Sequence, residues 1–146
     1  MRPAASTAVG MQARATSPRA RALRRALSQN ELTLHYQPVI GAQSGIVVGV
    51  EALIRWQHPE RGLLTPAHFI TAAEISGLIV PIGEWVIRTA CRQIAEWQGT
   101  VAQPLTVAIN LSARQFQHPD LVAQIRAAIS ESDVDPALLE FEITES

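Results

Sequence analysis

The chain contains no lysine, so each of its 12 basic residues is an arginine. It has a single cysteine, Cys91, which excludes an internal disulfide framework and is compatible with a reducing compartment. No apolar run approaches the roughly 20 residues that a membrane span needs. The N-terminus also lacks the apolar core of a secretory signal. We therefore expect a soluble, cytoplasmic protein.

Charge is distributed unevenly along the sequence. Residues 1–30 hold six arginines and no acidic residue, whereas residues 31–146 hold six arginines and 13 acidic residues. Residues 1–16 are small and polar without a period, and we interpret them as a disordered leader. An organelle transit peptide is a second interpretation of this composition. No nucleic-acid partner is expected, because no aromatic residue is interleaved with the arginines.

The rest of the sequence predicts helices that alternate with strands. Helices are predicted over residues 17–30, 65–77, 83–99 and 119–130. Strands are predicted over residues 31–40, 46–56, 105–112 and 136–146, and a loop over 57–62. The first two strands are spaced as a hairpin, and the later ones have the spacing of parallel β/α units. This pattern predicts an α/β fold that is complete neither as a doubly wound sheet nor as a barrel.

Three of these strands carry a polar residue where a covered strand should be apolar: Glu51, Asn110 and Glu142. Asn110 and Glu142 lie near the carboxyl ends of their strands, where parallel β/α proteins place their active sites. Two carboxylates and one amide oxygen would suit Mg²⁺ or Mn²⁺ better than Zn²⁺. The alternative is structural, with Glu51 in a buried salt bridge to Arg55.

Six segments carry a more specific signal. They are YQPVI (36–40), VEALIRW (50–56), PAHFITAAEISGLI (66–79), PIGEWVIRTAC (81–91), INLSARQF (109–116) and LEFEITES (139–146). Their order and spacing resemble the EAL-domain family of bacterial cyclic-di-GMP phosphodiesterases, over about residues 20–146. The resemblance implies a modified (β/α)8 barrel of the TIM type whose first strand is antiparallel, with about four of the eight strands in this chain.

The resemblance implies a role for several acidic and amide residues. Glu51, Asn110 and Glu142 match the residues that hold Mg²⁺ or Mn²⁺ in the family, so Glu51 would also take part in catalysis. Glu145 matches a glutamate that anchors a mobile catalytic loop.

Three further residues match positions that contact the substrate. Gln37 and Arg55 correspond to residues that bind the cyclic dinucleotide, Arg55 through a phosphate, and Leu53 corresponds to a leucine of the substrate pocket. The reaction implied by the resemblance is hydrolysis of cyclic-di-GMP to linear pGpG.

The chain departs from the family in length. A barrel of this type has roughly 250 residues, and the paired aspartates of the DDFGTG loop, the lysine and a later glutamate ligand have no counterpart here. We expect residues 31–146 to be a truncated EAL domain that is inactive alone, with the edge of its last strand unpaired. A homodimer, or a sensor or GGDEF domain joined through helix 17–30, is the expected protein partner. The alternative function is a non-catalytic fragment that binds cyclic-di-GMP or a protein.

Overall fold

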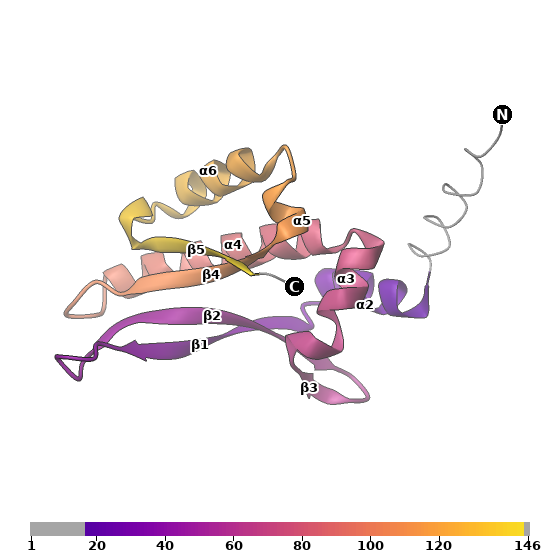
Figure 1. Cartoon of the computed structure of the whole chain (residues 1–146), viewed down its shortest axis with the longest axis horizontal. Coiled ribbons are helices and arrows are strands. Elements are labelled where there is room, and N and C mark those ends of the chain that lie inside the picture. The colour runs from indigo at the N-terminus through magenta and orange to yellow at the C-terminus, as the bar shows by residue number, and fades with distance from the viewer. Residues whose placement is uncertain (1–16, 145–146) are drawn as a thin grey trace. The chain divides into compact units, whose positions relative to one another are not determined.

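The computed structural model describes residues 17–144, which form two compact units. Of these residues, the first unit contains 17–33 and 55–82, and the second contains 34–54 and 83–144. Figure 1 shows the elements of both units in chain order. No helix within residues 17–144 is both long and apolar enough to cross a membrane.

The first unit begins with helix α2 (Pro18–Ser28), which lies within the range predicted as a helix. Its N-cap is Ser17, whose hydroxyl oxygen accepts a hydrogen bond from the Ala20 N–H at 3.2 Å. Proline is favoured at the first helical position because that position needs no N–H donor. The buried side of α2 centres on Leu23, which is fully enclosed.

A second hairpin, absent from the sequence prediction, follows in this unit. Strand β2 (Val47–His58) extends two residues further than expected, and β3 (Gly62–Leu64) pairs with it in antiparallel register, Trp56 opposite Leu64. The prediction of a loop over 57–62 is therefore wrong at both ends. Three residues of strand are too few to show the alternation from which a strand is predicted.

The helix predicted over 65–77 is divided into η1 (Pro66–His68) and α3 (Ile70–Ser76). Phe69 separates the two parts with a φ of −143°. Its ring is buried and packs edge-on against Trp56, with ring centroids 5.7 Å apart. Phe69 thus departs from helical backbone geometry at the position where its ring enters the buried contact with Trp56.

The sequence predicts Thr65 as the N-cap of this segment and Gly77 as its end, and the two predictions have different outcomes. Thr65 makes no capping hydrogen bond through its side chain; its hydroxyl lies 3.1 Å from Nδ1 of His68 instead. Gly77 ends α3 in the left-handed conformation, with a φ of 80° that favours glycine, as predicted.

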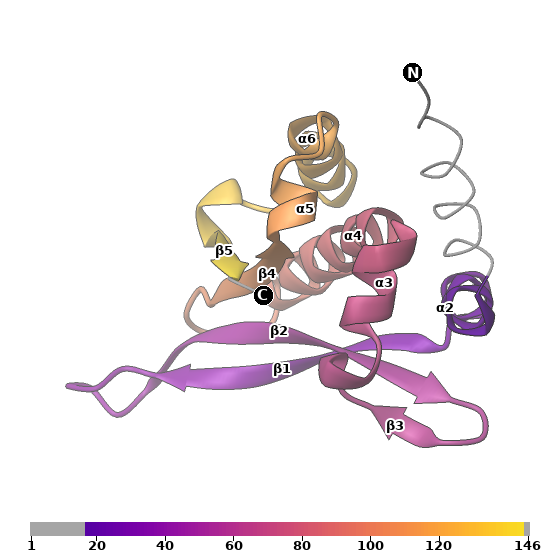
Figure 2. The same ribbon diagram turned by 45° about the vertical axis from the view of Figure 1, so that its right-hand side comes forward.

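The sheet has the strand order β1 (Leu32–Ile40), β2, β4 (Thr106–Ser112) and β5 (Leu139–Thr144). Figure 2 shows β1 and β2 running in opposite directions, and the Gly41 N–H donates to the Ile46 carbonyl at 2.9 Å to close their turn. β2 with β4 and β4 with β5 are parallel. An antiparallel first pair followed by parallel pairs confirms the predicted α/β arrangement.

Helix α4 (Ile79–Gln98) begins four residues before the predicted range. Pro81 explains the difference, because proline is tolerated in the first turn, where its missing N–H has no partner to lose. In the second unit α4 runs alongside β4 (Figures 1 and 2). Cys91 is fully buried on this helix, and burial raises the pKa of its thiol. The apolar stripe of residues 83–99 includes Cys91 and predicts a packed thiol, which this burial confirms.

Two helices connect β4 to β5 in the second unit. The four-residue helix α5 (Ala113–Phe116) was not expected, whereas α6 (Leu121–Ser132) matches the predicted helix. Leu121 of α6 is buried as predicted, but Val122 is 60% exposed. The apolar pattern of residues 119–130 predicts Leu121 and Val122 both inward, but Val122 lies about 100° around the helix from Leu121 and so leaves the buried face. A 3-10 turn, η2 (Pro136–Leu138), leads into β5.

Candidate functional site

Strand register places three of the predicted site residues on one face of the sheet. Glu51 of β2 is paired with Ala108 of β4, and Asn110 of β4 is paired with Glu142 of β5. Paired residues of neighbouring strands point to the same side, and so do Ala108 and Asn110, which are two residues apart. Glu51, Asn110 and Glu142 therefore follow one another across three adjacent strands on the same face.

Glu51 and Asn110 are also in direct contact. The Nδ2 atom of Asn110 donates a hydrogen bond to Oε1 of Glu51 at 2.8 Å, and both residues are half-buried. The bond involves neither the second carboxylate oxygen of Glu51 nor the amide oxygen of Asn110. Since Asn110 is neutral, this contact orients the carboxylate and leaves its negative charge uncompensated by the amide.

The chemistry of this donor set fits a hard divalent cation. Carboxylate and amide oxygens suit Mg²⁺ and Mn²⁺, whereas Zn²⁺ favours sulfur and imidazole. Within residues 17–144, no group of three or more His, Cys, Asp or Glu side chains is placed to hold a metal ion. A site here consequently needs the amide of Asn110 as well as Glu51 and Glu142.

The predicted substrate residues lie on β1 and β2. Leu53 and Arg55 follow Glu51 at every second position of β2, and both are half-buried. Gln37 is exposed on β1. Glu145, the predicted loop anchor, lies outside the described residues.

Tyr36 shows which way the neighbouring Gln37 points. The Tyr36 ring packs edge-on against Trp97 of α4, with centroids 4.9 Å apart, and burial raises the pKa of Tyr36 to about 12. Because neighbouring residues of a strand point to opposite faces, Gln37 points away from α4. The face of Glu51 is likewise the one turned away from the fully buried Ile109.

Glu31, Trp56 and Arg25 form a cluster around a second carboxylate, which the sequence does not predict. Glu31 in the first unit accepts a hydrogen bond from the Trp56 indole N–H at 2.9 Å and forms an ion pair with Arg25, also at 2.9 Å. The Trp56 bond and the Arg25 charge lower the pKa of the Glu31 carboxyl. Glu31 and Trp56 are 25 residues apart, so no spacing rule predicts their contact.

A buried polar pair at the end of β4 was also missed, although its signal was present. Ser112 and Gln115 form a capping box, in which each side chain accepts a hydrogen bond from the other's backbone N–H. A Ser followed three residues later by Gln is a helix-start signature, and the segment INLSARQF contains it.

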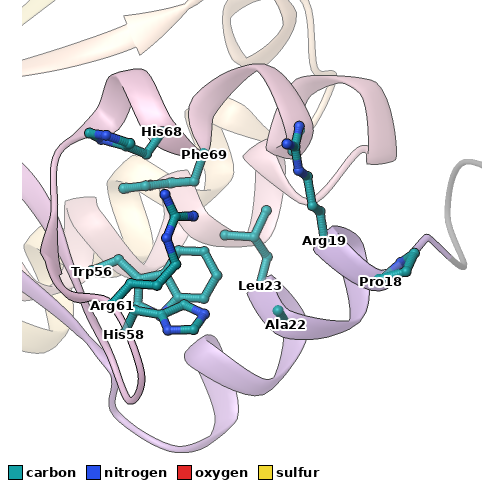
Figure 3. A pocket seen from close by; sticks show the side chains of 10 residues that line it. Pro18, Arg19, Ala22, Leu23, Trp56, His58, Arg61, His68 and Phe69 are labelled. Atoms are coloured by element: carbon teal, nitrogen blue, oxygen red, sulfur yellow. The ribbon is translucent and has the colours of Figure 1, made fainter.

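The first unit holds a cavity of about 190 Å³ between α2 and the β2–β3 hairpin (Figure 3). Trp56 and Phe69 form its aromatic part, and its basic side chains come from Arg19, Arg61 and two histidines. Figure 3 shows Arg61 extending from the hairpin toward Phe69. None of the residues predicted from the sequence to bind metal or substrate lines this cavity.

The amino-acid sequence is similar to those of several known proteins. The chain is 50% identical over 125 residues to the uncharacterized protein sll1895 of Synechocystis, covering 86% of this chain and 18% of that protein. It is 48% identical over 124 residues to MucR of Pseudomonas aeruginosa, a bifunctional diguanylate cyclase/cyclic di-GMP phosphodiesterase, covering 85% and 18%. The chain thus spans less than a fifth of the length of these curated relatives.

The same likeness holds in three dimensions. The solved structure of the PaMucR phosphodiesterase in complex with c-di-GMP superposes with a TM-score of 0.84 at 46% identity, covering 89% of this chain and 53% of that one. The family model described as the EAL domain matches residues 20–146, which include α2 except its first two residues, and the five strands. The chain belongs to the EAL domain family.

Proposed function

We propose that this chain contributes the N-terminal part of a cyclic-di-GMP phosphodiesterase domain, in which Glu51, Asn110 and Glu142 hold Mg²⁺ or Mn²⁺. EAL phosphodiesterases depend on divalent metal ions, and relatives of this chain act on or bind cyclic-di-GMP. The observation that carries the proposal is the Asn110–Glu51 hydrogen bond, on the face that Glu142 shares.

Different residues of the chain would bind the cation and the substrate. Glu51 and Glu142 supply the negative charge that retains a cation, and the Asn110 amide orients Glu51. When bound, the metal supplies Lewis acidity and a water nucleophile near neutral pH. Arg55 offers a planar pair of donors that can bind two oxygens of one phosphate and offset its charge.

Leu53 and Gln37 would complete the contacts with the dinucleotide, one apolar and one through an amide. Addition of one water across one of the two phosphodiester bonds opens the ring, and the product is linear pGpG. Glu145 would anchor a catalytic loop beside this site.

The remaining organisation of the protein is part of the same proposal. Residues 1–16 would form a leader, and helix 17–30 would join the domain of residues 31–146 to a sensor or GGDEF domain. The domain would act in the cytoplasm, either with such a partner or as a homodimer. The single thiol, buried and reduced, fits that compartment.

A non-catalytic binding fragment is the second candidate. It is favoured by the small donor set, since the proposed ligands are two carboxylates and one amide, and residues 17–144 hold no group of three or more His, Cys, Asp or Glu side chains placed to bind a metal ion. A hydrated Mg²⁺ demands near-octahedral coordination, which three protein donors supply only in part. Dinucleotide binding without turnover is the behaviour that this candidate predicts.

A chimera tests the catalytic proposal directly. Residues 20–146 would replace the matching part of the MucR phosphodiesterase domain, and pGpG formation from cyclic-di-GMP and Mn²⁺ would be followed by chromatography. We expect an active chimera that loses activity on Glu51→Gln and keeps it on Glu60→Gln, an exposed glutamate outside the site. The unmodified chain should release no pGpG.

Two outcomes would count against this proposal. A folded chimera that binds cyclic-di-GMP but forms no pGpG would favour the binding fragment. A chimera whose activity survives Glu51→Gln would remove the metal-ligand role from Glu51.

A further inference from the structure

Strand β4 ends in a buried polar junction. Ser112 and Gln115 are 7% and 6% exposed, and they are the two polar residues buried within the described part of the chain. The Gln115 N–H donates to the Ser112 hydroxyl at 3.2 Å, and the Ser112 N–H donates to Oε1 of Gln115 at 3.0 Å. The helix they cap has four residues, too few to be stable by itself. What the two bonds fix is the end of β4.

Helix α4 holds the other end of the Gln115 side chain. A Cβ atom at Gly83 would overlap Nε2 of Gln115 and lie 2.6 Å from its Cδ. Glycine is unfavourable inside a helix relative to alanine, and the position of Gln115 gives a reason for it here. The amide therefore sits between α4 and the backbone of Ser112, without room to move toward the helix.

Strand β5 fixes the same point from its other side. The Thr144 hydroxyl donates to the Leu111 carbonyl at 3.3 Å, and Thr144 is paired with Ser112 in the parallel register. Residues 111 and 112 are thus bonded to β5 and to Gln115 at once.

Asn110 lies two residues before this junction and depends on it for its position. A slip of one residue would turn Asn110 to the opposite face, and its bond to Glu51 tolerates far less than that. We propose that Gln115, seated against Gly83, is a positioning residue that holds the Asn110 amide at Glu51. The use of Asn110 as a metal ligand rests on the proposed function, whereas the positioning itself does not.

The side-chain amide of Asn110 reports on this directly. In the metal-free chain, NMR should show its hydrogen-bonded Nδ2 proton protected from exchange with water. Gln115→Met keeps the length of the side chain and removes both polar atoms; we expect at least tenfold faster exchange. Gly83→Ala should give the same change by displacing the amide. Gln115→Glu keeps an acceptor for the Ser112 N–H and should restore most of the protection.

The control is Ile94→Val, a small loss of packing in the buried stripe of α4. It should leave the Asn110 exchange rate unchanged. Equal exchange rates in the unmodified chain, Gln115→Met and Gly83→Ala would overturn the positioning role. So would an Ile94→Val variant that accelerates exchange as much as Gln115→Met does.

A Mn²⁺ titration separates this inference from the proposed function. We expect about tenfold weaker Mn²⁺ binding in Gln115→Met, the usual size of effect for a residue that orients a ligand. If the unmodified chain binds no Mn²⁺ and Gln115→Met still accelerates Asn110 exchange, the positioning role is supported and the metal site is contradicted.

Discussion

Glu31 in the first unit and Glu51 in the second are both half-buried carboxylates, but they are hydrogen-bonded to different kinds of partner. Glu31 accepts from the Trp56 indole and pairs with the Arg25 guanidinium, a cation. Glu51 accepts from the Asn110 amide, which is neutral. The Arg25 charge offsets that of Glu31, whereas the amide orients Glu51 without offsetting its charge.

The difference separates a carboxylate that stabilises the fold from one suited to a ligand. A carboxylate with a built-in cation gains little by binding another, whereas one held by a neutral donor keeps its affinity for a cation from solution. Substitutions at the two positions should accordingly affect different properties, stability at Glu31 and metal binding at Glu51.

The largest effect should come from removing the aromatic partner of Glu31. Trp56→Ala deletes the ring that donates to Glu31 and packs against Phe69, and we expect a loss of about 3–5 kcal/mol in unfolding free energy. Urea denaturation followed by circular dichroism measures it. Trp85→Ala, at a half-buried ring of α4, should lose less; the reverse order would contradict an anchoring role for Trp56.

Removing the carboxylate itself should have a smaller effect of the same kind. Glu31→Leu leaves the indole N–H of buried Trp56 without its acceptor, which we expect to lower the unfolding free energy by about 2 kcal/mol. The matched control, Glu60→Gln, changes an exposed side chain and should stay within about 0.5 kcal/mol. Equal urea midpoints for the two variants would show that the Glu31 cluster does not stabilise the unit.

Glu51→Gln should affect binding and leave stability nearly unchanged. Glutamine can still accept from Asn110, so the substitution removes the charge and keeps the bond. We expect at least tenfold weaker Mn²⁺ binding by calorimetry, about 1.4 kcal/mol, and unfolding within about 0.5 kcal/mol of the unmodified chain. Glu60→Gln, at an exposed side chain in the turn between β2 and β3, is the control. Identical Mn²⁺ affinities in both variants would contradict a metal-binding role for Glu51, and with it the contrast between Glu51 and Glu31.

The smallest expected effect is on the acid limb of the stability profile. Hydrogen bonding by Trp56 and pairing with Arg25 lower the pKa of Glu31 from its ordinary value of 4.5. A carboxylate with a depressed folded pKa stabilises the protein above its unfolded pKa, and this contribution is lost as the pH falls through the folded pKa. Glu31→Gln should thus flatten the decline in urea midpoint below about pH 4.5. An unchanged slope would show that Glu31 is not the group responsible.

The sequence predicts the sheet well because its main signal is local. Alternation along β2 and β4 identifies Glu51 and Asn110 as polar exceptions in covered strands, and parity groups residues by face only within each strand. Their 2.8 Å bond depends on the register between strands 59 residues apart, which no local pattern contains. The same holds for Glu31 and Trp56.

Other elements were missed because they are short or begin unusually. Strand β3 has three residues, below the length at which a period appears. Helix α4 begins at Ile79, four residues before the predicted range, because Pro81 in its first turn costs no hydrogen bond. The apolar character of Val122 predicts a place on the buried face of α6. Its side chain is exposed instead, because it lies about 100° around the helix from buried Leu121.

The buried thiol of Cys91 is a built-in probe for opening of the second unit. A reagent that modifies thiolates meets no other cysteine, and burial both hides this one and raises its pKa. Modification therefore requires the packing around Cys91 to open, and its rate at low reagent concentration reports the population of that opened form. Every variant proposed above thus carries a single native label whose reaction time reports how often the second unit comes apart.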